Sequence, residues 1–265
     1  MSERQLTAPY VATTWASWRV LSPLFGRGLF LSTGEEWKHQ RRTVAPAFAP
    51  RAVRILARHA AAAGNSLVND LIAMGKPRID LVPVLQRLAL EIIGSAMFSL
   101  EMKKSGVEMR RLIFRYAARL GRPTLLDFAL PLAIPTPYDF GSRRFRRRWM
   151  ALIERIIDER RRKPGDGAEP DLFDLFGTGQ SESDCSAEQL ADQVATIVVA
   201  GHETTAAALF RSLYLMASAP EEQGAVAADA ASVDLGPESA ADAVPRLFRT
   251  RAVVDEALHY TRRHL

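Results

Sequence analysis

The sequence is poor in cysteine and in long uncharged apolar segments. One cysteine, Cys185, stands among 265 residues, which excludes an internal disulfide and fits the reducing environment of the cytoplasm. Residues 1–31 contain no charged start followed by an unbroken apolar run, so no signal peptide is expected. No membrane span is predicted either, because the longest apolar helical segment contains His202, Glu203 and Arg211, which would lie inside the bilayer.

The sequence also lacks a pattern typical of β-sheets, since all the long segments have the period of a helix. Hydrophobic residues make up 48% and charged residues 25%, with a net charge of +5, as in ordinary globular proteins. We therefore predict an all-α fold with the whole chain, residues 1–265, in a single domain. Helices are expected over residues 35–44, 51–74, 81–100, 108–120, 142–163, 171–176 and 187–219, in a segment after Pro220, and over 245–260, after an N-terminal loop with one short helical turn. Ser32 or Thr33 is expected to cap the first of these helices and Asp80 the third, and Gly75 is expected to end the second.

The chain is organised around the long helix predicted over residues 187–219. Ser186 and Gln189 have the pattern of a capping box at its start, and Pro220 marks its end. Between Val194 and Ala200 every residue but one is apolar, which predicts a helix buried on all sides. At 1.5 Å per residue such a helix would be roughly 50 Å long.

A polar motif, Ala200-Gly201-His202-Glu203-Thr204-Thr205, interrupts this apolar helix. Glycine costs about 1 kcal/mol relative to alanine in a helix interior, and a buried carboxylate costs more unless it is paired. The threonines can donate to a carbonyl one turn earlier and bend the helix. Destabilising residues gathered at one point of a buried helix are typical of a functional site.

A zinc site is excluded at the same place. His202-Glu203 begins like the motif His-Glu-x-x-His, which places two imidazoles on one helix face, but the fifth position is Ala206. A lone histidine is more often a packing residue or part of a pocket wall than a metal ligand. Cys185 lies beside Asp184, whose negative charge disfavours a thiolate.

The motif at 200–205, in the middle of a long apolar helix, resembles the oxygen-activating helix of the cytochrome P450 family, the haem-thiolate monooxygenases. A second segment, residues 34–48, is similar to the family's helix that binds the haem propionates, a role that would belong to Trp37 and Arg41. Taken alone, these two side chains four residues apart also fit a surface cation–π pair. The resemblance favours the haem-binding role and implies a partial, mainly α fold of this family around one central helix.

The resemblance implies that Glu203 and Thr204 are catalytic, as a relay of general acids that delivers protons to dioxygen. Ala200, Gly201 and Thr205 would contact the haem (iron protoporphyrin), and Gly201 would allow its close approach. The implied reaction inserts one oxygen atom of O2 into a small apolar substrate, with electrons from a ferredoxin or a flavoprotein reductase. A bacterial-type cytoplasmic enzyme is expected, without a nucleic-acid partner.

The sequence departs from the family pattern near both ends. The family's strand-rich N-terminal part is missing, and so is the loop that carries the haem-ligating cysteine. Cys185 is not expected to be that ligand, because it lies roughly 22 Å from Ala200 along a straight helix. The family's Glu-x-x-Arg appears here as Glu256 followed by His259, so Glu256 is expected to have a structural role in a weakened ion pair. We expect a truncated domain that is inactive by itself.

Two alternatives stay open: a catalytically dead fragment, and an all-α binding module that uses the basic helix over residues 142–163. That helix carries many arginines, which fits nucleic-acid binding. It also carries apolar residues at helical spacing, which favours an amphipathic surface helix with a solvated basic face. The residues of this apolar stripe are Phe145, Trp149, Leu152, Ile153, Ile156 and Ile157.

Overall fold

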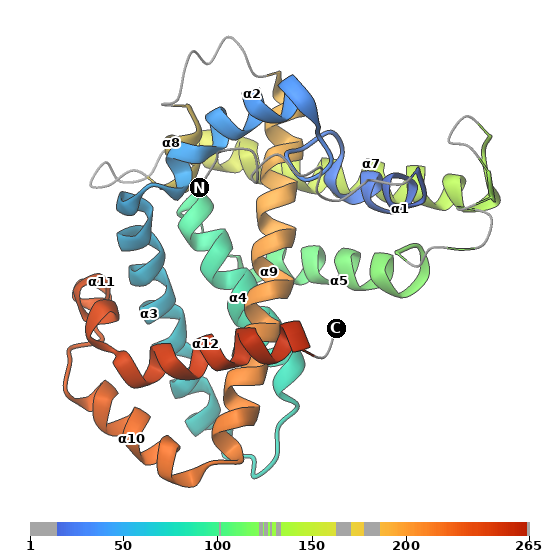
Figure 1. Cartoon of the computed structure of the whole chain (residues 1–265). Helices are drawn as coiled ribbons and strands as arrows, with labels where there is room; N and C mark the ends of the chain where they lie inside the picture. Colours follow the sequence, from blue (N-terminus) through green and yellow to red (C-terminus); the bar gives the residue numbers. More distant parts are fainter. Residues whose placement is uncertain are drawn as a thin grey trace, which may run out of the picture.

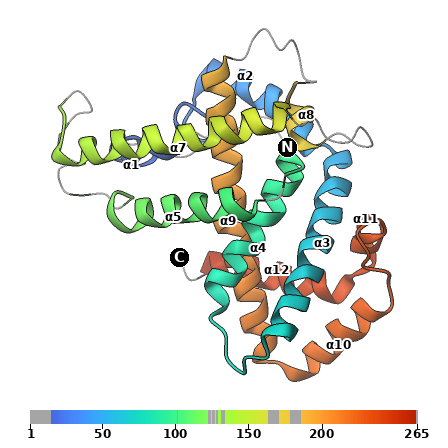
Figure 2. The ribbon, with the colours of Figure 1, turned by 180° about the vertical axis from the view of Figure 1, so that it is seen from behind.

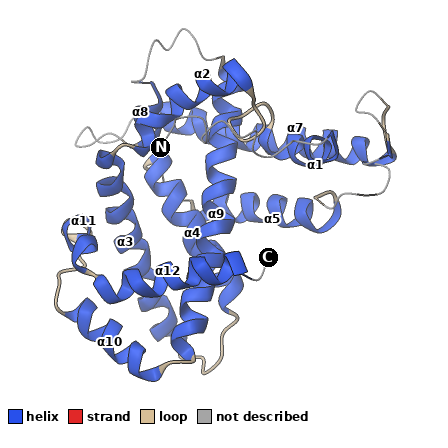
Figure 3. Cartoon of the chain, viewed as in Figure 1, coloured by secondary structure: helices blue, strands red, loops and turns tan. Residues whose placement is uncertain are grey.

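The computed structural model describes residues 15–100, 102–121, 124, 127, 129–130, 134–162, 171–177 and 186–263. Helices make up the fold in these ranges, which contain no strand (Figure 1 and Figure 3). The elements are α1 (Trp15–Phe25), α2 (Gly34–Val44), η2 (Ala45–Phe48), α3 (Pro50–Met74), α4 (Leu81–Phe98), α5 (Lys103–Arg119), α7 (Pro137–Arg162), α8 (Leu172–Gly177), α9 (Ala187–Ala217), α10 (Pro220–Ala231), α11 (Ala240–Ala243), η3 (Val244–Arg246) and α12 (Phe248–Arg263). The all-α prediction is confirmed.

Helix α9 runs through the middle of the molecule and contacts most of the other long helices (Figure 1). Its most extensive partner is α4, which packs on its other side against α3, while α12 crosses α9 further along. Figure 2 shows α5 and α7 side by side, in front of α9 in this view. Val194, Ala195 and Val198 of α9 are completely buried, so the predicted central position of this helix is confirmed.

Several helix ends are determined by local chemistry that the sequence predicted. Ser186 and Gln189 form the capping box at the start of α9, with bonds of 3.2 and 3.0 Å. The carboxylate of Asp80 accepts from the N–H of Val82 at 3.1 Å, at the start of α4. Gly75 ends α3 with a φ of +58°, a conformation that glycine adopts without strain. The cap expected from Ser32 or Thr33 at the start of α2 is wrong, because the Thr33 side chain makes no capping bond and the Ser32 hydroxyl donates to the carbonyl of Leu29 at 3.2 Å.

Two expectations about the N-terminal and middle segments are wrong. Part of the segment predicted as a loop with one helical turn forms α1, a helix of 11 residues that contains Pro23 in its last turns. Packing stabilises this helix in spite of the proline: Leu24 is buried, and its carbonyl accepts from the indole N–H of Trp149 at 2.9 Å. Helices α5 and α7 both begin five residues earlier than predicted, α7 at Pro137, a favoured residue in a first helical turn.

Helix α7 is amphipathic, as its sequence predicted. All six residues of the apolar stripe are buried, and Trp149 and Ile153 have no exposed surface. The basic face is not wholly solvated, however. Arg160 is 5% exposed and pairs with Asp171 at 2.6 Å and Asp174 at 2.9 Å. Burial acts to lower the pKa of Arg160, but the hydrogen bonds and charges of the two carboxylates outweigh it and raise that pKa.

Helix α4 is long and apolar enough to cross a membrane, judged by length and composition alone. The sequence prediction considered only the central helix for such a role and did not single out α4. In the structure α4 lies between α3 and α9 and contacts both. A helix in the core of a protein can have the same length and composition, and 39% of α4 is buried inside the molecule.

Candidate functional site

The polar motif lies in the middle of α9, which remains helical through it. The segment 194–199 just before the motif is almost entirely buried, whereas Ala200, Glu203 and Thr204 are exposed. Residues three and four apart lie on one face of a helix, so these side chains form one stripe, which we call the exposed stripe of α9. Thr205 is exposed beside it. The central helix therefore changes from a core element to a surface at the motif.

The hydroxyl of Thr204 donates to the carbonyl of Ala200 at 2.5 Å, one turn earlier. This bond was predicted from the tendency of threonine in helices. Because the hydroxyl hydrogen is held within the helix, the lone pairs of Oγ1 are left to accept from a donor on the exposed side. Thr204 is thus positioned as an acceptor at the exposed stripe.

The carboxylate of Glu203 is more exposed than its place in an apolar helix predicted. Its side chain is 52% exposed, so the desolvation cost of burial is largely absent. It lines a groove of about 450 Å³ between α9 and α4, together with Gln86, Phe210 and Arg211. Protons can therefore reach this carboxylate from solvent.

The buried polar residue of the motif is His202, which is 1% exposed. Its Nδ1 atom lies 3.4 Å from Oε1 of Glu203. Neither ring nitrogen has a hydrogen-bond partner among the residues that the structure describes. Burial lowers the pKa of His202, the Glu203 carboxylate opposes that change, and the charge of Arg110 adds to it. The imidazole is therefore held neutral, in accordance with its predicted role as a packing residue.

Gly201 faces the neighbouring helix. A side chain added there would lie 3.4 Å from Cγ1 of Ile93 on α4. This is an ordinary van der Waals distance, so packing against α4 does not itself require glycine at this position. Its part in a close approach to haem stays a prediction.

Trp37 and Arg41 lie together on α2, as their spacing predicted. The guanidinium carbon of Arg41 is 5.1 Å from the centroid of the Trp37 ring, and both side chains are exposed. This is the geometry of a surface cation–π pair. It also leaves a guanidinium and an indole available to an incoming carboxylate, so the predicted propionate contact is neither required nor prevented by the fold.

A buried pair of glutamines, missed by the sequence analysis, links α2 to α9. The Gln193 side-chain amide donates to Oε1 of Gln40 at 2.7 Å, and Gln40 donates to the carbonyl of Arg27 at 2.8 Å. Gln40 lies on the same helix as the exposed tryptophan–arginine pair. The two glutamines therefore hold the predicted propionate helix at a definite place relative to the motif helix. The available signal in the sequence was a glutamine directly before the apolar segment of α9.

Asp192 makes a second buried link to α9. Its carboxylate accepts from the N–H of Arg27 at 2.8 Å and pairs with the guanidinium of Arg146. Gly26 lies directly against this carboxylate with a φ of +58°, so any side chain there would be strained and would overlap Asp192. The turn between α1 and α2 is thereby docked on the first half of α9.

Two of the remaining predicted residues, Glu256 and His259, contact no other residue of the site within the described part of the chain. Cys185 lies outside the described residues. Glu256 is exposed and forms no ion pair with another residue in the part of the chain that the structure describes. His259 contacts its own helix, with Nδ1 2.7 Å from the carbonyl of Asp255. The structural role of Glu256 stays a prediction. No group of three His, Cys, Asp or Glu side chains that could hold a metal ion occurs within the described ranges.

Comparison with known proteins identifies the family. The family model "Cytochrome P450" matches residues 14–262. The chain is 31% identical over 245 residues to cyclooctatin synthase of Streptomyces melanosporofaciens, covering 89% of this chain and 52% of that protein. It is 28% identical over 243 residues to cyclooctat-9-en-7-ol 5-monooxygenase of the same organism, covering 89% and 51%.

Solved structures share the fold. The crystal structure of a cytochrome P450 matches with a TM-score of 0.73 at 24% identity, over 91% of this chain and 57% of that one. The chain spans about half the length of the curated relatives it matches. Because the family model covers nearly all of the sequence, the chain belongs to the cytochrome P450 family.

Proposed function

We propose that the chain is part of one cytochrome P450 domain that binds haem and inserts one oxygen atom of O2 into an apolar organic substrate. The observation that carries this proposal is the exposed stripe of α9. Small and proton-bearing side chains, Ala200, Glu203 and Thr204, emerge together on one face of α9 directly after its buried segment 194–199. The surface of the central helix therefore begins at the motif.

The residues present fit one face of a haem. Ala200 and Thr204 are small and one turn apart, so a flat ring can lie against the helix, with Gly201 and Thr205 adjacent. Arg41 presents free donors on α2, which suit a propionate carboxylate. When bound, haem supplies the iron at which dioxygen is reduced. We propose that Cys185 is not its axial ligand and that this chain alone does not turn over substrate.

The protein's own contribution is proton delivery. Glu203 is half exposed and exchanges protons with solvent through the groove beside it. Thr204, whose hydrogen is held by Ala200, accepts a hydrogen bond from a protonated water and so orients it. General acid catalysis through such a relay depends first on geometry. Here the two side chains are adjacent on one helix and reach the same exposed face.

The related cyclooctat-9-en-7-ol 5-monooxygenase supports the class of reaction and an organic substrate. We propose that a ferredoxin or a flavoprotein reductase supplies the electrons and that the protein is cytoplasmic. No nucleic-acid partner is proposed, because the apolar stripe of α7 is buried in the core and its helix is an ordinary amphipathic element.

A haem titration of the purified chain tests the proposal. We expect haem to bind, and the double variant Trp37→Ala/Arg41→Ala to bind it about tenfold more weakly, the effect of losing one charge-assisted contact. Variants at His39, exposed on the same helix, serve as controls. Unchanged haem binding in the double variant would contradict the propionate role.

The carbon monoxide difference spectrum of the reduced, haem-loaded chain tests the ligand. We expect no strongly red-shifted Soret band, because no cysteine loop is present. A strongly red-shifted band would show that a thiolate reaches the iron and would contradict the exclusion of Cys185.

A further inference from the structure

A hollow of about 940 Å³ lies between α1, α7 and the first turns of α9. Its volume is within the range of pockets that take small organic molecules. Asp192 in its wall precedes Ala200 by roughly 12 Å along the helix axis. The hollow is therefore separate from the exposed stripe proposed to face haem.

Arginines dominate the charge of this hollow. Arg143, Arg146 and Arg147 line it from α7, where residues three and four apart share one face. Arg146 is paired with Asp192. Arg143 and Arg147 are exposed and form no ion pair with any other residue that the structure describes. Like charges one turn apart destabilise a helix, and a bound anion would remove that repulsion.

Apolar side chains stand beside these free cations. Trp18 and Phe140 line the hollow and are 36% and 76% exposed, and Pro23 and Pro135 lie with them. Together these side chains give the hollow an apolar wall in addition to its charged one. Aromatic surface next to unpaired guanidinium groups suits a ligand with an apolar body and a negative group.

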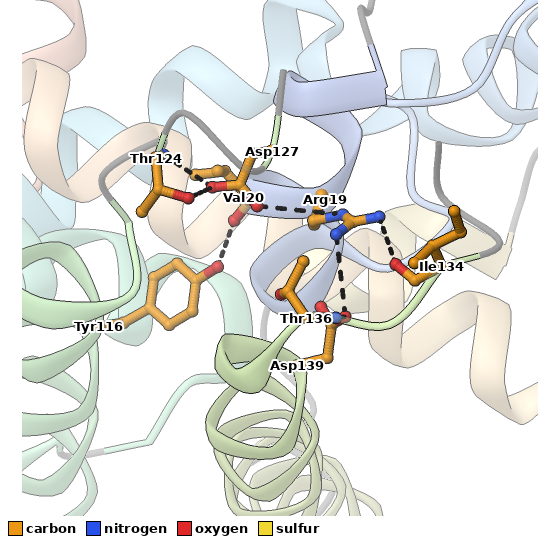
Figure 4. Close-up of polar contacts among 8 residues, drawn as sticks. All are labelled: Arg19, Val20, Tyr116, Thr124, Asp127, Ile134, Thr136 and Asp139. Atoms are coloured by element: carbon orange, nitrogen blue, oxygen red, sulfur yellow. Dashed lines mark hydrogen bonds and ion pairs between the residues drawn. The ribbon is translucent and has the colours of Figure 1, made fainter. Parts of the chain in front are cut away.

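One wall of the hollow is already fixed by a buried cluster around Arg19 (Figure 4). Arg19 donates to the carbonyl of Ile134 at 3.1 Å and lies 3.9 Å from carboxylate oxygens of both Asp127 and Asp139. Asp139 in turn accepts from the N–H of Thr136 at 2.6 Å. These contacts hold residues 134–139 against α1. The hollow is thus preformed, and Arg19 and Asp139 balance each other's charge.

We propose that this hollow, the arginine hollow, binds a small organic carboxylate. Its negative group lies between Arg143 and Arg147, and its apolar body lies against Trp18 and Phe140. The concave shape favours a small molecule over a flat macromolecular surface. This inference goes beyond the proposed monooxygenase function and does not require haem.

Calorimetric titration of the chain, without haem, tests the inference with two probes of the same shape. We expect 2-naphthoate to bind and the uncharged 2-naphthamide to bind at least about tenfold more weakly, because the naphthamide lacks the charge-assisted hydrogen bonds. The double variant Arg143→Ala/Arg147→Ala should weaken naphthoate binding by a similar factor. The matched control Arg144→Ala/Arg148→Ala removes the same charge from α7 outside the hollow and should retain binding.

A substitution of Glu188 provides a further test. It lines the hollow and forms no ion pair with another described residue, so Glu188→Gln should strengthen naphthoate binding. The inference is overturned if naphthoate does not bind or if the two probes bind equally well. It is also overturned if both double variants lose naphthoate binding to the same extent. Binding of the chain to anionic phosphatidylglycerol vesicles without binding of naphthoate would assign the arginines to a membrane surface and would also overturn it. Circular dichroism checks that each variant is folded.

Discussion

The two halves of α9 use polar side chains in opposite ways. In the first half, Asp192, Gln193 and Thr196 are buried, and each is bonded to the backbone or to a side chain nearby. In the second half, Ser212 is also buried, but Glu203 and Thr204 are exposed on one stripe. A polar residue in an apolar helix is therefore not by itself a sign of chemistry. Its burial and its partners decide whether it holds the fold together or remains available for a reaction.

The largest loss of stability is expected when the carboxylate of Asp192, in the first half of α9, is removed. Asp192→Ala leaves the partly buried guanidinium of Arg146 without its partner, which costs about 3–5 kcal/mol for buried pairs. Urea unfolding followed by circular dichroism measures the change. Glu188→Ala, an exposed carboxylate one turn earlier, should alter the free energy of unfolding by less than about 0.5 kcal/mol. Similar losses in the two variants would show that Asp192 has no special structural role.

Substitutions in the glutamine pair should lower the free energy of unfolding by less, and the effects of the two substitutions should be coupled. Gln40→Leu or Gln193→Leu leaves one buried amide unsatisfied, which costs about 1–3 kcal/mol. The double variant removes both amides, so its loss should be smaller than the sum of the single losses. A double-mutant cycle in urea measures the coupling. Additive losses would indicate that the 2.7 Å bond contributes nothing beyond packing.

Protonation of buried histidines should weaken the fold in mildly acidic solution. Burial lowers the pKa of His202 and of His59 below the ordinary value of 6.5, so the unfolded chain binds protons first. The free energy of unfolding should fall as the pH drops below 6.5, by at most about 1.4 kcal/mol per pH unit for each histidine.

Unfolding measured from about pH 7.5 to about pH 5.5 tests this window. His202→Phe should reduce the slope, because the imidazole that must be protonated is gone. His39→Gln, at an exposed position, is the control. A slope unchanged by His202→Phe would mean that other groups cause the acid sensitivity.

The smallest effect on stability is expected at Thr204, in the second half of α9. Its hydroxyl is exposed and bonds only within its own helix, so Thr204→Ala should change the free energy of unfolding by less than about 0.5 kcal/mol. In a complete parent enzyme, however, the same change should uncouple oxygen consumption from product formation. Thr204→Ser keeps the hydroxyl and should retain coupling. Unchanged coupling in the alanine variant would contradict the proton-relay role.

Much of the fold could be predicted from the sequence because its signals are local. The capping box at Ser186, the glycine cap at Gly75 and the apolar stripe of α7 each depend on residues within one or two turns. The resemblance carried by residues 200–205 and 34–48 then identified the family. Local signals failed where tertiary packing decided the outcome, as in α1, which stays helical with Pro23 inside it.

The buried polar contacts of the site could not be predicted in the same way. Gln40 and Gln193 are 153 positions apart, and no local pattern indicates that they meet. The exposure of Glu203 was also unpredictable, because a helix period does not reveal which face has no neighbour. For the same reason the sequence did not show that Gly201 faces Ile93 of α4.

The docking of the Gly26 turn on Asp192 has a consequence for how the protein is made. The N–H of Arg27 and the carboxylate of Asp192 are 165 positions apart. At 5–20 residues per second, the ribosome needs roughly 8 to 33 s to synthesise the chain between them. During that interval α1 can pack only against helices already made, such as α7, and its contacts with α9 cannot form. The amino-terminal part of this chain therefore stays incompletely packed until the central helix has been synthesised.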